Sequence, residues 1–237
     1  MKNIFLAFVL LTVSGLVSAQ KVINDANAEV RNVSSFHAIH VSNSFNVIIT
    51  QGATESVAVS ANDKEDVADI KTYVENGVLK ILFDKKDKWW PKNRKLKAYI
   101  AVKNLDEIKG NGASDFKIDG SLNASNLKLD FSGASDLDGK LIVSGNLNIH
   151  LSGASDVDIN GSANEVSIDA NGASDVKAFD FTTTNCIVDA SGASSVRITV
   201  DKELSAKLSG ASSVQYKGTA LIKDIKTSGA SSISRKS

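Results

Sequence analysis

Residues 127–157 read LKLDFSGASDLDGKLIVSGNLNIHLSGASDV and contain the pattern that decides the fold. Apolar and polar residues alternate around two Gly-Ala-Ser triplets, which begin at Gly133 and Gly153. Alternation with a period of two is typical of a β-strand that buries one face. Each triplet is therefore expected to join two short strands at a bend.

The triplet recurs along the rest of the chain, at intervals of 18 to 21 residues. Its seven glycines are Gly112, Gly133, Gly153, Gly172, Gly192, Gly210 and Gly229. A unit of about 20 residues cannot bury an apolar face alone, but units stacked about 4.8 Å apart share one continuous core. The sequence thus predicts an all-β fold, a right-handed parallel β-helix or closely related β-solenoid.

The chemistry of the triplet suits a tight corner and requires no ligand. Glycine permits a positive φ and a close backbone approach, alanine is small, and serine bonds to nearby backbone groups. If the strand alternation continues through the corner, each serine points inward and the next residue points outward. The outward row reads Asp115, Asp136, Asp156, Asp175, Ser195, Ser213 and Ser232.

The region before the repeats also has β patterns, but they are less regular. We expect one domain over 20–237, in which 20–105 form an N-terminal β cap or irregular coils and 106–237 form the Gly-Ala-Ser repeats. Asn76-Gly77 stands between two apolar segments and favours a hairpin turn.

Residues 1–19 are typical of a cleavable secretory signal peptide. Lys2 precedes an apolar run over 4–13, and small residues precede a cleavage point before Gln20. That run is shorter than the roughly 20 residues that a membrane-spanning helix needs. The mature chain is thus expected to be exported without a transmembrane segment, and to be periplasmic, cell-surface or secreted.

Composition narrows the classes of function. The chain has 27 basic and 27 acidic residues, a formal net charge of zero, so it lacks the basic surface that nucleic-acid binding favours. Its one cysteine, Cys186, cannot form an internal disulfide and falls in an apolar column of the repeats. With three histidines there is no zinc-site spacing, and no cofactor, metal or catalytic residue is predicted.

The segment from Asp84 to Lys95 is the best candidate for ligand recognition. It contains both tryptophans and the only proline among six basic residues. Lys88, Trp89, Trp90 and Arg94 are the candidate ligand-binding residues, because indole rings and cations can contact a glycan or a cell-surface protein. The alternative is that the tryptophans cover an edge of the solenoid while the lysines are solvated.

An acidic face is the second candidate. Asp136 and Asp138 in one coil should neighbour Asp156 and Asp158 in the next, and oxygen ligands suit Ca²⁺. The alternative is a solvated face. The sequence does not decide whether this face binds a cation.

The chain also resembles a known family. The segments FHAIHV, SFNVIITQG, ENGVLKI and AYIAVKNLDEIKGNGASD, followed by the SGASD copies, are similar to the putative auto-transporter adhesin, head GIN domain family over about residues 36–237. The resemblance implies a β-helical fold and a secreted or envelope protein of Bacteroidetes-type bacteria. It implies no catalytic residues.

We therefore expect an exported, non-enzymatic binding, adhesion or structural module of the cell envelope. The alternative is a β-helix enzyme acting on polysaccharide, for which no nucleophile, acid or base can be assigned from the sequence. The open ends of a solenoid leave homo-oligomerisation possible.

Overall fold

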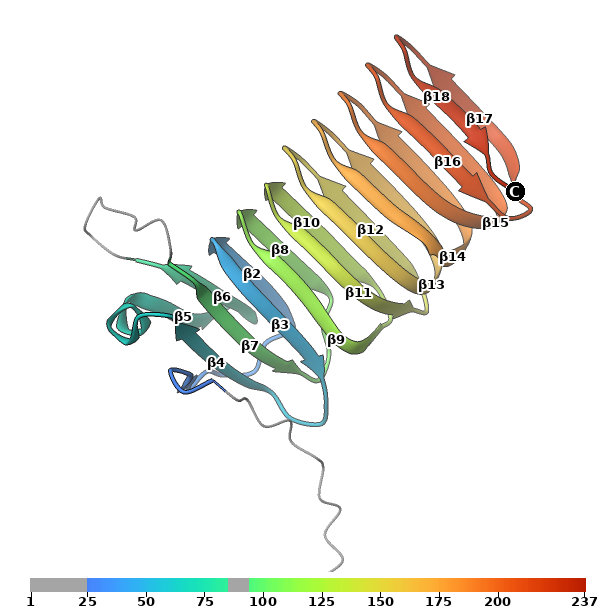
Figure 1. The fold of residues 1–237 in the computed structure, drawn as a ribbon. Helices are drawn as coiled ribbons and strands as arrows, with labels where there is room; N and C mark the ends of the chain where they lie inside the picture. The colour runs from blue at the N-terminus through green and yellow to red at the C-terminus, as the bar shows by residue number, and fades with distance from the viewer. Residues whose placement is uncertain (1–24, 85–93) are drawn as a thin grey trace, which may run out of the picture.

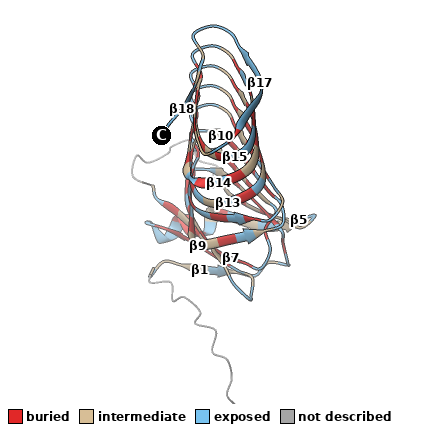
Figure 2. Ribbon diagram, turned by 90° about the vertical axis from the view of Figure 1, so that its right-hand side faces the viewer, coloured by how far each residue is buried: buried red, intermediate tan, exposed pale blue. Residues whose placement is uncertain are grey.

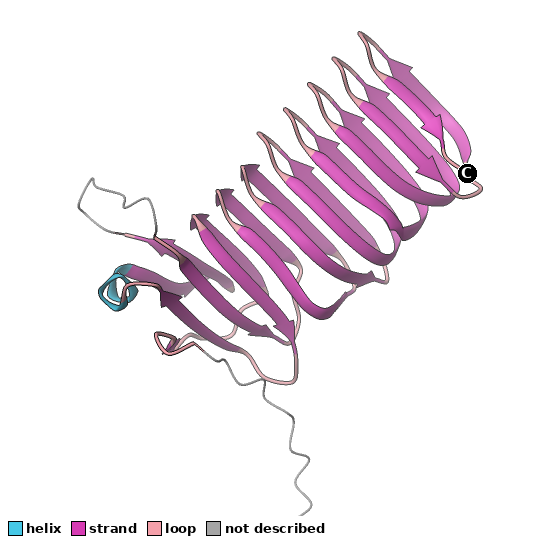
Figure 3. Ribbon diagram, in the orientation of Figure 1, coloured by secondary structure: helices cyan, strands magenta, loops and turns pink. Residues whose placement is uncertain are grey.

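The computed structural model describes residues 25–84 and 94–237, and within them the chain is almost entirely β-structure (Figures 1 and 3). The N-terminal part contains β1 (Glu29–Arg31), β2 (Ala38–Asn43), β3 (Phe45–Gln51), β4 (Ser56–Ala61), the 3-10 helix η1 (Lys64–Asp69), β5 (Ile70–Glu75), β6 (Val78–Phe83) and β7 (Leu96–Val102). The repeats contain β8 (Glu107–Gly112), β9 (Asp115–Ala124), β10 (Leu127–Gly133), β11 (Asp136–Val143), β12 (Asn146–Leu151), β13 (Asp156–Ala170), β14 (Asp175–Ala190), β15 (Ser195–Leu208), β16 (Ser213–Lys217), β17 (Leu221–Thr227) and β18 (Ser232–Arg235).

The strands stack in parallel as two layers of a β-solenoid, which confirms the predicted fold class (Figure 1). Strands that lead into a corner form the first layer: β6, β2, β8, β10, β12, the ends of β13, β14 and β15, and β17. Strands that leave a corner form the second layer: β7, β3, β9, β11, the beginnings of β13, β14 and β15, then β16 and β18. We call the edge with the Gly-Ala-Ser triplets the corner edge, and the opposite edge, where one coil leads into the next, the turn edge.

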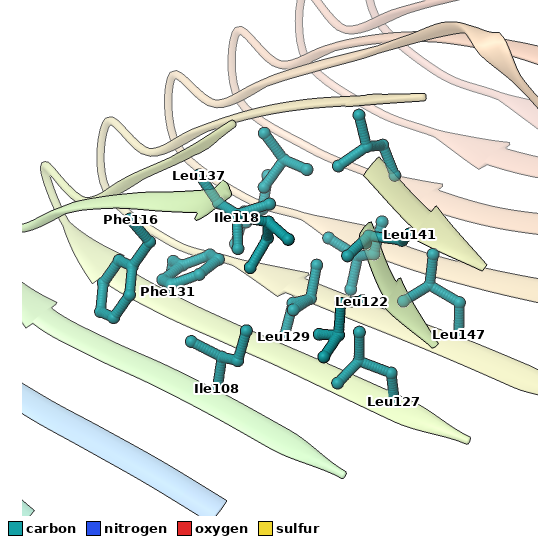
Figure 4. Close-up of a cluster of buried hydrophobic side chains, with 14 of the residues drawn as sticks. Ile108, Phe116, Ile118, Leu122, Leu127, Leu129, Phe131, Leu137, Leu141 and Leu147 are labelled. Atoms are coloured by element: carbon teal, nitrogen blue, oxygen red, sulfur yellow. The ribbon is translucent and has the colours of Figure 1, made fainter. Parts of the chain in front are cut away.

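The core lies between the two layers and follows the alternation in the sequence (Figure 2). In β10 the inward side chains Leu127, Leu129 and Phe131 are at most 1% exposed. Phe131 contacts Phe116 of the preceding coil, with ring centroids 5.2 Å apart (Figure 4). Because each such side chain contributes about 1.5–3 kcal/mol when fully buried, this continuous column is the main source of stability.

The corner geometry requires glycine for two reasons. The triplet glycines have φ between +73° and +104°, a region that side chains disfavour. The coils also approach closely, since the Ala154 N–H donates to the Gly133 carbonyl at 2.7 Å. A Cβ on Gly153 would lie 2.5 Å from that same oxygen. Neighbouring corners therefore stack backbone on backbone.

The triplet serines point inward, as the strand alternation predicts. Ser114, Ser135, Ser155, Ser174, Ser194 and Ser212 are each at most 1% exposed. The Ser194 hydroxyl donates to the Ser191 carbonyl at 2.8 Å within its own corner. Between coils, the Ser135 N–H donates to the Ser155 hydroxyl oxygen at 3.3 Å. These bonds pair polar groups that the corner buries.

A further coil precedes the first Gly-Ala-Ser triplet. It is formed by β2 and β3, and its corner residue is Asn43, with φ +84°. The Asn43 carbonyl accepts the Ala113 N–H at 2.8 Å, as a glycine carbonyl does in later coils. Asparagine tolerates this backbone region better than most residues. The less regular N-terminal region thus includes a regular coil with a different corner sequence.

Antiparallel strands and η1 cover the N-terminal end of the core. β4 pairs with β7 and β1, and β5 pairs with β6 through the hairpin predicted at Asn76-Gly77. Asn76 and Gly77 have φ +52° and +76°, as a type I′ turn requires. Val67 of η1 and Ile70 of β5 are at most 3% exposed. This end therefore forms an antiparallel cap on the parallel coils.

Asp25 attaches the first described residues to the cap. Its carboxylate accepts hydrogen bonds from the Tyr99 hydroxyl at 2.8 Å and the Lys97 ammonium at 3.1 Å. The Tyr99 bond, together with Lys97, lowers the pKa of Asp25 from 3.8 to about 2. Within the described residues, no helix has the length and apolar character needed to cross a membrane.

The two demands on a corner glycine can be separated with three alanine substitutions. Gly52→Ala should change the free energy of unfolding by no more than about 0.5 kcal/mol, because its Cβ would meet nothing within 4 Å. Gly120→Ala adds only the strain of φ +91°, about 1–2 kcal/mol. Gly153→Ala adds that strain and the contact with Gly133, so it should destabilise most. Equivalent losses for all three variants in urea unfolding would contradict this account.

Asp25 should make the cap acid-labile. Its pKa is lower in the folded chain than in the unfolded chain, so its stabilisation is present above about pH 4 and is lost as the pH falls towards 2. Asp25→Asn should therefore show a shallower loss of unfolding free energy over pH 4 to 2 than the natural chain. The exposed Asp201→Asn is the control. Equal slopes for the natural chain and Asp25→Asn would refute the assignment.

Candidate functional site

The recognition segment predicted from the sequence connects β6 to β7. Lys88, Trp89 and Trp90 lie outside the described residues, whereas its two flanks are described. β6 runs parallel to β2 and β7 runs parallel to β3, so both flanks lie beside the corner of the β2–β3 coil. The Phe83 N–H donates to the Asn43 side-chain oxygen at 3.0 Å. The segment therefore starts and ends at the corner edge, next to the cap.

Arg94 lies in a buried ion pair at the base of this segment. Its Nε donates to Asp66 Oδ2 at 2.7 Å, and the two side chains are 3% and 7% exposed. Its guanidinium also lies over the Phe83 ring, 4.5 Å from the centroid. These contacts join β6, η1 and the start of β7. The structure thus places this candidate ligand-binding residue beneath the surface, as an anchor.

Hydrogen bonds donated by backbone N–H groups hold the same two flanks in place. The Asp84 N–H donates to the Asp69 carbonyl at 2.9 Å, and the Lys95 N–H donates to Asn62 Oδ1 at 2.7 Å. Each bond runs from a flank of the segment to the cap. Flanks that are already held in place lower the entropic cost of binding a ligand, because fewer groups have to become ordered.

The outward aspartates form the predicted row, and basic side chains accompany part of it. Lys177 lies 3.4 Å from Asp156, and Arg197 lies 3.6 Å from Asp175. At Asp115, burial and then the Asp136 charge raise the pKa of the carboxyl. Where basic residues are present, they relieve the repulsion expected between stacked carboxylates.

The acidic face at Asp136, Asp138, Asp156 and Asp158 has the predicted adjacency. β11 and β13 place Asp138 beside Asp158, and Asp136 Oδ1 accepts the Asp156 N–H at 3.0 Å. Over residues 25–84 and 94–237, no three His, Cys, Asp or Glu side chains come together as a metal site would require.

Each of the three histidines pairs with a carboxylate of a neighbouring coil, in or directly before the strands of the first layer. His37 Nδ1 lies 3.0 Å from Asp106, His40 Nε2 lies 3.3 Å from Glu107, and His150 Nδ1 lies 3.1 Å from Asp169. Burial acts to raise the pKa of Glu107, but bonds from Lys128 and His40 outweigh it and lower that pKa. These pairs link successive coils.

Cys186 lies in the core, as the repeat alignment predicts. It is 2% exposed, and burial raises the pKa of its thiol to about 12. The thiol therefore stays protonated at neutral pH and lacks the thiolate character of a reactive cysteine.

The structure also reveals a groove on the turn edge that the sequence reasoning did not identify. The groove has a volume of about 610 Å³ and is bounded by the connections β7–β8, β9–β10 and β11–β12. It is lined by His37, Asn104, Leu105, Asp106, Asn123, Ala124, Ser125, Asn126, Ile142 and Ser144. The corresponding signal in the sequence is the set of Asn and Ser residues midway between triplets, which reads as ordinary turn chemistry.

These features define the class of protein as a parallel β-solenoid with an antiparallel cap at its N-terminal end. The family model for the putative auto-transporter adhesin, head GIN domain matches residues 35–220, so the chain belongs to that family, and the resemblance seen in the sequence is confirmed. No curated protein matches the chain.

Several solved structures share the architecture, including the following three. A putative adhesin from Bacteroides fragilis NCTC 9343 superimposes with a TM-score of 0.81 at 22% identity, covering 88% of this chain and 96% of that one. A putative lipid binding protein from Parabacteroides distasonis ATCC 8503 gives 0.68 at 20% identity, with 90% and 98% covered. A putative adhesin from Parabacteroides merdae ATCC 43184 gives 0.65 at 17% identity, with 89% and 95% covered. At these identities the likeness shows the fold alone.

Removing one member of the buried pair should destabilise the cap strongly. Arg94→Met or Asp66→Leu removes one partner of this buried pair and should lower the unfolding free energy by about 3–5 kcal/mol. The double variant should cost less than the sum of the two single variants, because the interaction between the two side chains is lost only once. Lys207→Ala, in a mostly exposed pair with Asp189, should cost about 1 kcal/mol or less. A double variant as unstable as the sum of the singles would contradict the pairing.

Proposed function

We propose that the chain is an exported, non-enzymatic binding module of the bacterial cell envelope, of the adhesion type. Residues 1–19 act as the signal peptide, and 20–237 form one solenoid domain. Membership of the head GIN domain family and the likeness to putative adhesins support an adhesion-type envelope role.

The observation that carries the proposal is the anchored base of the segment between β6 and β7. Arg94 and Asp66 are buried there, and both flanks are hydrogen-bonded to the cap. A segment whose flanks are anchored in this way and whose sequence contains two tryptophans and several lysines suits recognition of a glycan or a cell-surface protein, because indole rings contact sugar faces and bury much area. In this proposal Lys88, Trp89 and Trp90 contact the ligand, and Arg94 holds the segment.

Binding to a glycan array and to whole cells tests the proposal. With purified residues 20–237, the Trp89→Ala/Trp90→Ala variant should lose binding by about tenfold or more, since aromatic anchors dominate interface energetics. The matched control is Tyr73→Ala on β5, an aromatic residue that is 45% exposed elsewhere on the cap. Comparing binding with and without calcium tests whether a cation on the acidic face contributes to binding.

Two results would count against this assignment. Unchanged binding with a lower melting temperature in the tryptophan variant would mean that the indole rings cover the solenoid edge. Hydrolysis or elimination of a polysaccharide by the purified chain would favour the enzyme alternative.

A further inference from the structure

We propose that the turn-edge groove is a second binding site, which takes a neutral saccharide. The groove and the segment between β6 and β7 lie at opposite ends of β2. His37, which lines the groove, directly precedes β2 at the turn edge, whereas Asn43, which contacts a flank of the segment, ends β2 at the corner edge. The inference therefore does not depend on what the tryptophans do. Its volume, about 610 Å³, is within the range of roughly 300–1,000 Å³ that small-ligand sites occupy.

The groove presents hydrogen-bonding groups that are not committed to the fold. Within the described part of the chain, the side chains of Asn104, Ser125 and Ser144 form no hydrogen bond. An amide offers separate donor and acceptor atoms, and a hydroxyl offers both roles in one group. Neighbouring hydroxyls of a sugar ring need this mixture, because each donates one bond and accepts others.

The charge of the groove favours a neutral ligand over an anionic one. His37 and Asp106 are the ionisable residues among the described lining, and their side chains are 55% and 58% exposed. His37 Nδ1 lies 3.0 Å from the Asp106 carboxylate, which holds the carboxylate in place while leaving it accessible. A carboxylate is a strong acceptor for sugar hydroxyls and repels uronate, sialate or phosphate groups.

The groove also has an apolar surface for the C–H face of a sugar. Ile142 points outward from β11 and is 38% exposed, and its strand neighbour on β9 is Asn123, which also lines the groove. A small apolar surface surrounded by directional polar groups is the usual composition of a small-molecule site.

The walls are held in place by the stacking of the coils. The Gly145 N–H donates to the Ser125 carbonyl at 2.8 Å, and the Asn146 N–H donates to Asn126 Oδ1 at 3.0 Å. A Cβ on Gly145 would lie 2.7 Å from both Ser125 O and Asn126 Oδ1, so only glycine permits this approach. The polar groups are therefore positioned before any ligand arrives, which lowers the entropic cost of binding.

The test is a glycan array with neutral and anionic oligosaccharides, followed by titration calorimetry with the strongest neutral binder. The groove variant is Asn104→Ala/Ser144→Ala, which breaks no hydrogen bond of the described fold. We expect its affinity to fall about tenfold or more, the effect of losing two hydrogen bonds to a ligand. The matched control, Asn160→Ala/Thr182→Ala, removes the same groups from exposed positions outside the groove and should leave affinity unchanged.

Asp106→Asn provides a second variant, and it should weaken neutral binding while relaxing the discrimination against anionic glycans. Urea unfolding of each variant separates loss of binding from loss of fold. Loss of binding in the groove variant but not in Trp89→Ala/Trp90→Ala supports the groove and counts against the segment. The reverse pattern overturns the groove and supports the segment. Binding restricted to anionic glycans, or no glycan binding at all, also overturns the proposal.

Discussion

The backbone contact between neighbouring corners is the constraint on which the rest of the structure depends. Each triplet alanine N–H donates to the carbonyl of the corner residue one coil earlier, at 2.7 or 2.8 Å; this residue is Asn43 for the first triplet and a glycine for every later one, and no side chain fits between the glycine corners. This spacing sets the distance between strands in both layers. The core columns, the inward serines and the outward aspartates then follow, because each lies a fixed number of residues from a corner. Burial of the apolar columns supplies the stability, and the corners determine which residues are buried.

The repeat region could be predicted closely because one period governs every level of its structure. The positions of Leu129, Ser135 and Cys186 followed from counting residues relative to a glycine, and the structure places all three inside. The coil at Asn43 was harder to recognise, since its corner uses asparagine for the same backbone conformation. The cap was predicted only in outline, because antiparallel pairing across η1 depends on contacts between residues far apart in the sequence.

The candidate sites show a different limit. The role of Arg94 depends on Asp66, 28 residues away, and no local pattern distinguishes a buried cation from an exposed one. The groove is composed of three connections in successive coils, each of which reads as an ordinary turn. Its concavity arises only when those connections stack, so it has no signature in any single segment. Sites in repeat proteins commonly have this character, since the surface is shared by adjacent units.

The antiparallel cap has a consequence for how such a chain can change in length. It covers one end of the core and contacts only the first coils, while every later coil meets a neighbour with the same corner geometry. Duplication or loss of a whole repeat beyond β13 would therefore preserve the environment of the remaining coils. The groove and the segment beside the cap would stay intact while the body grew or shortened in steps of one strand spacing, about 4.8 Å. The length of the solenoid can thus change in evolution without altering the candidate binding surfaces near the cap.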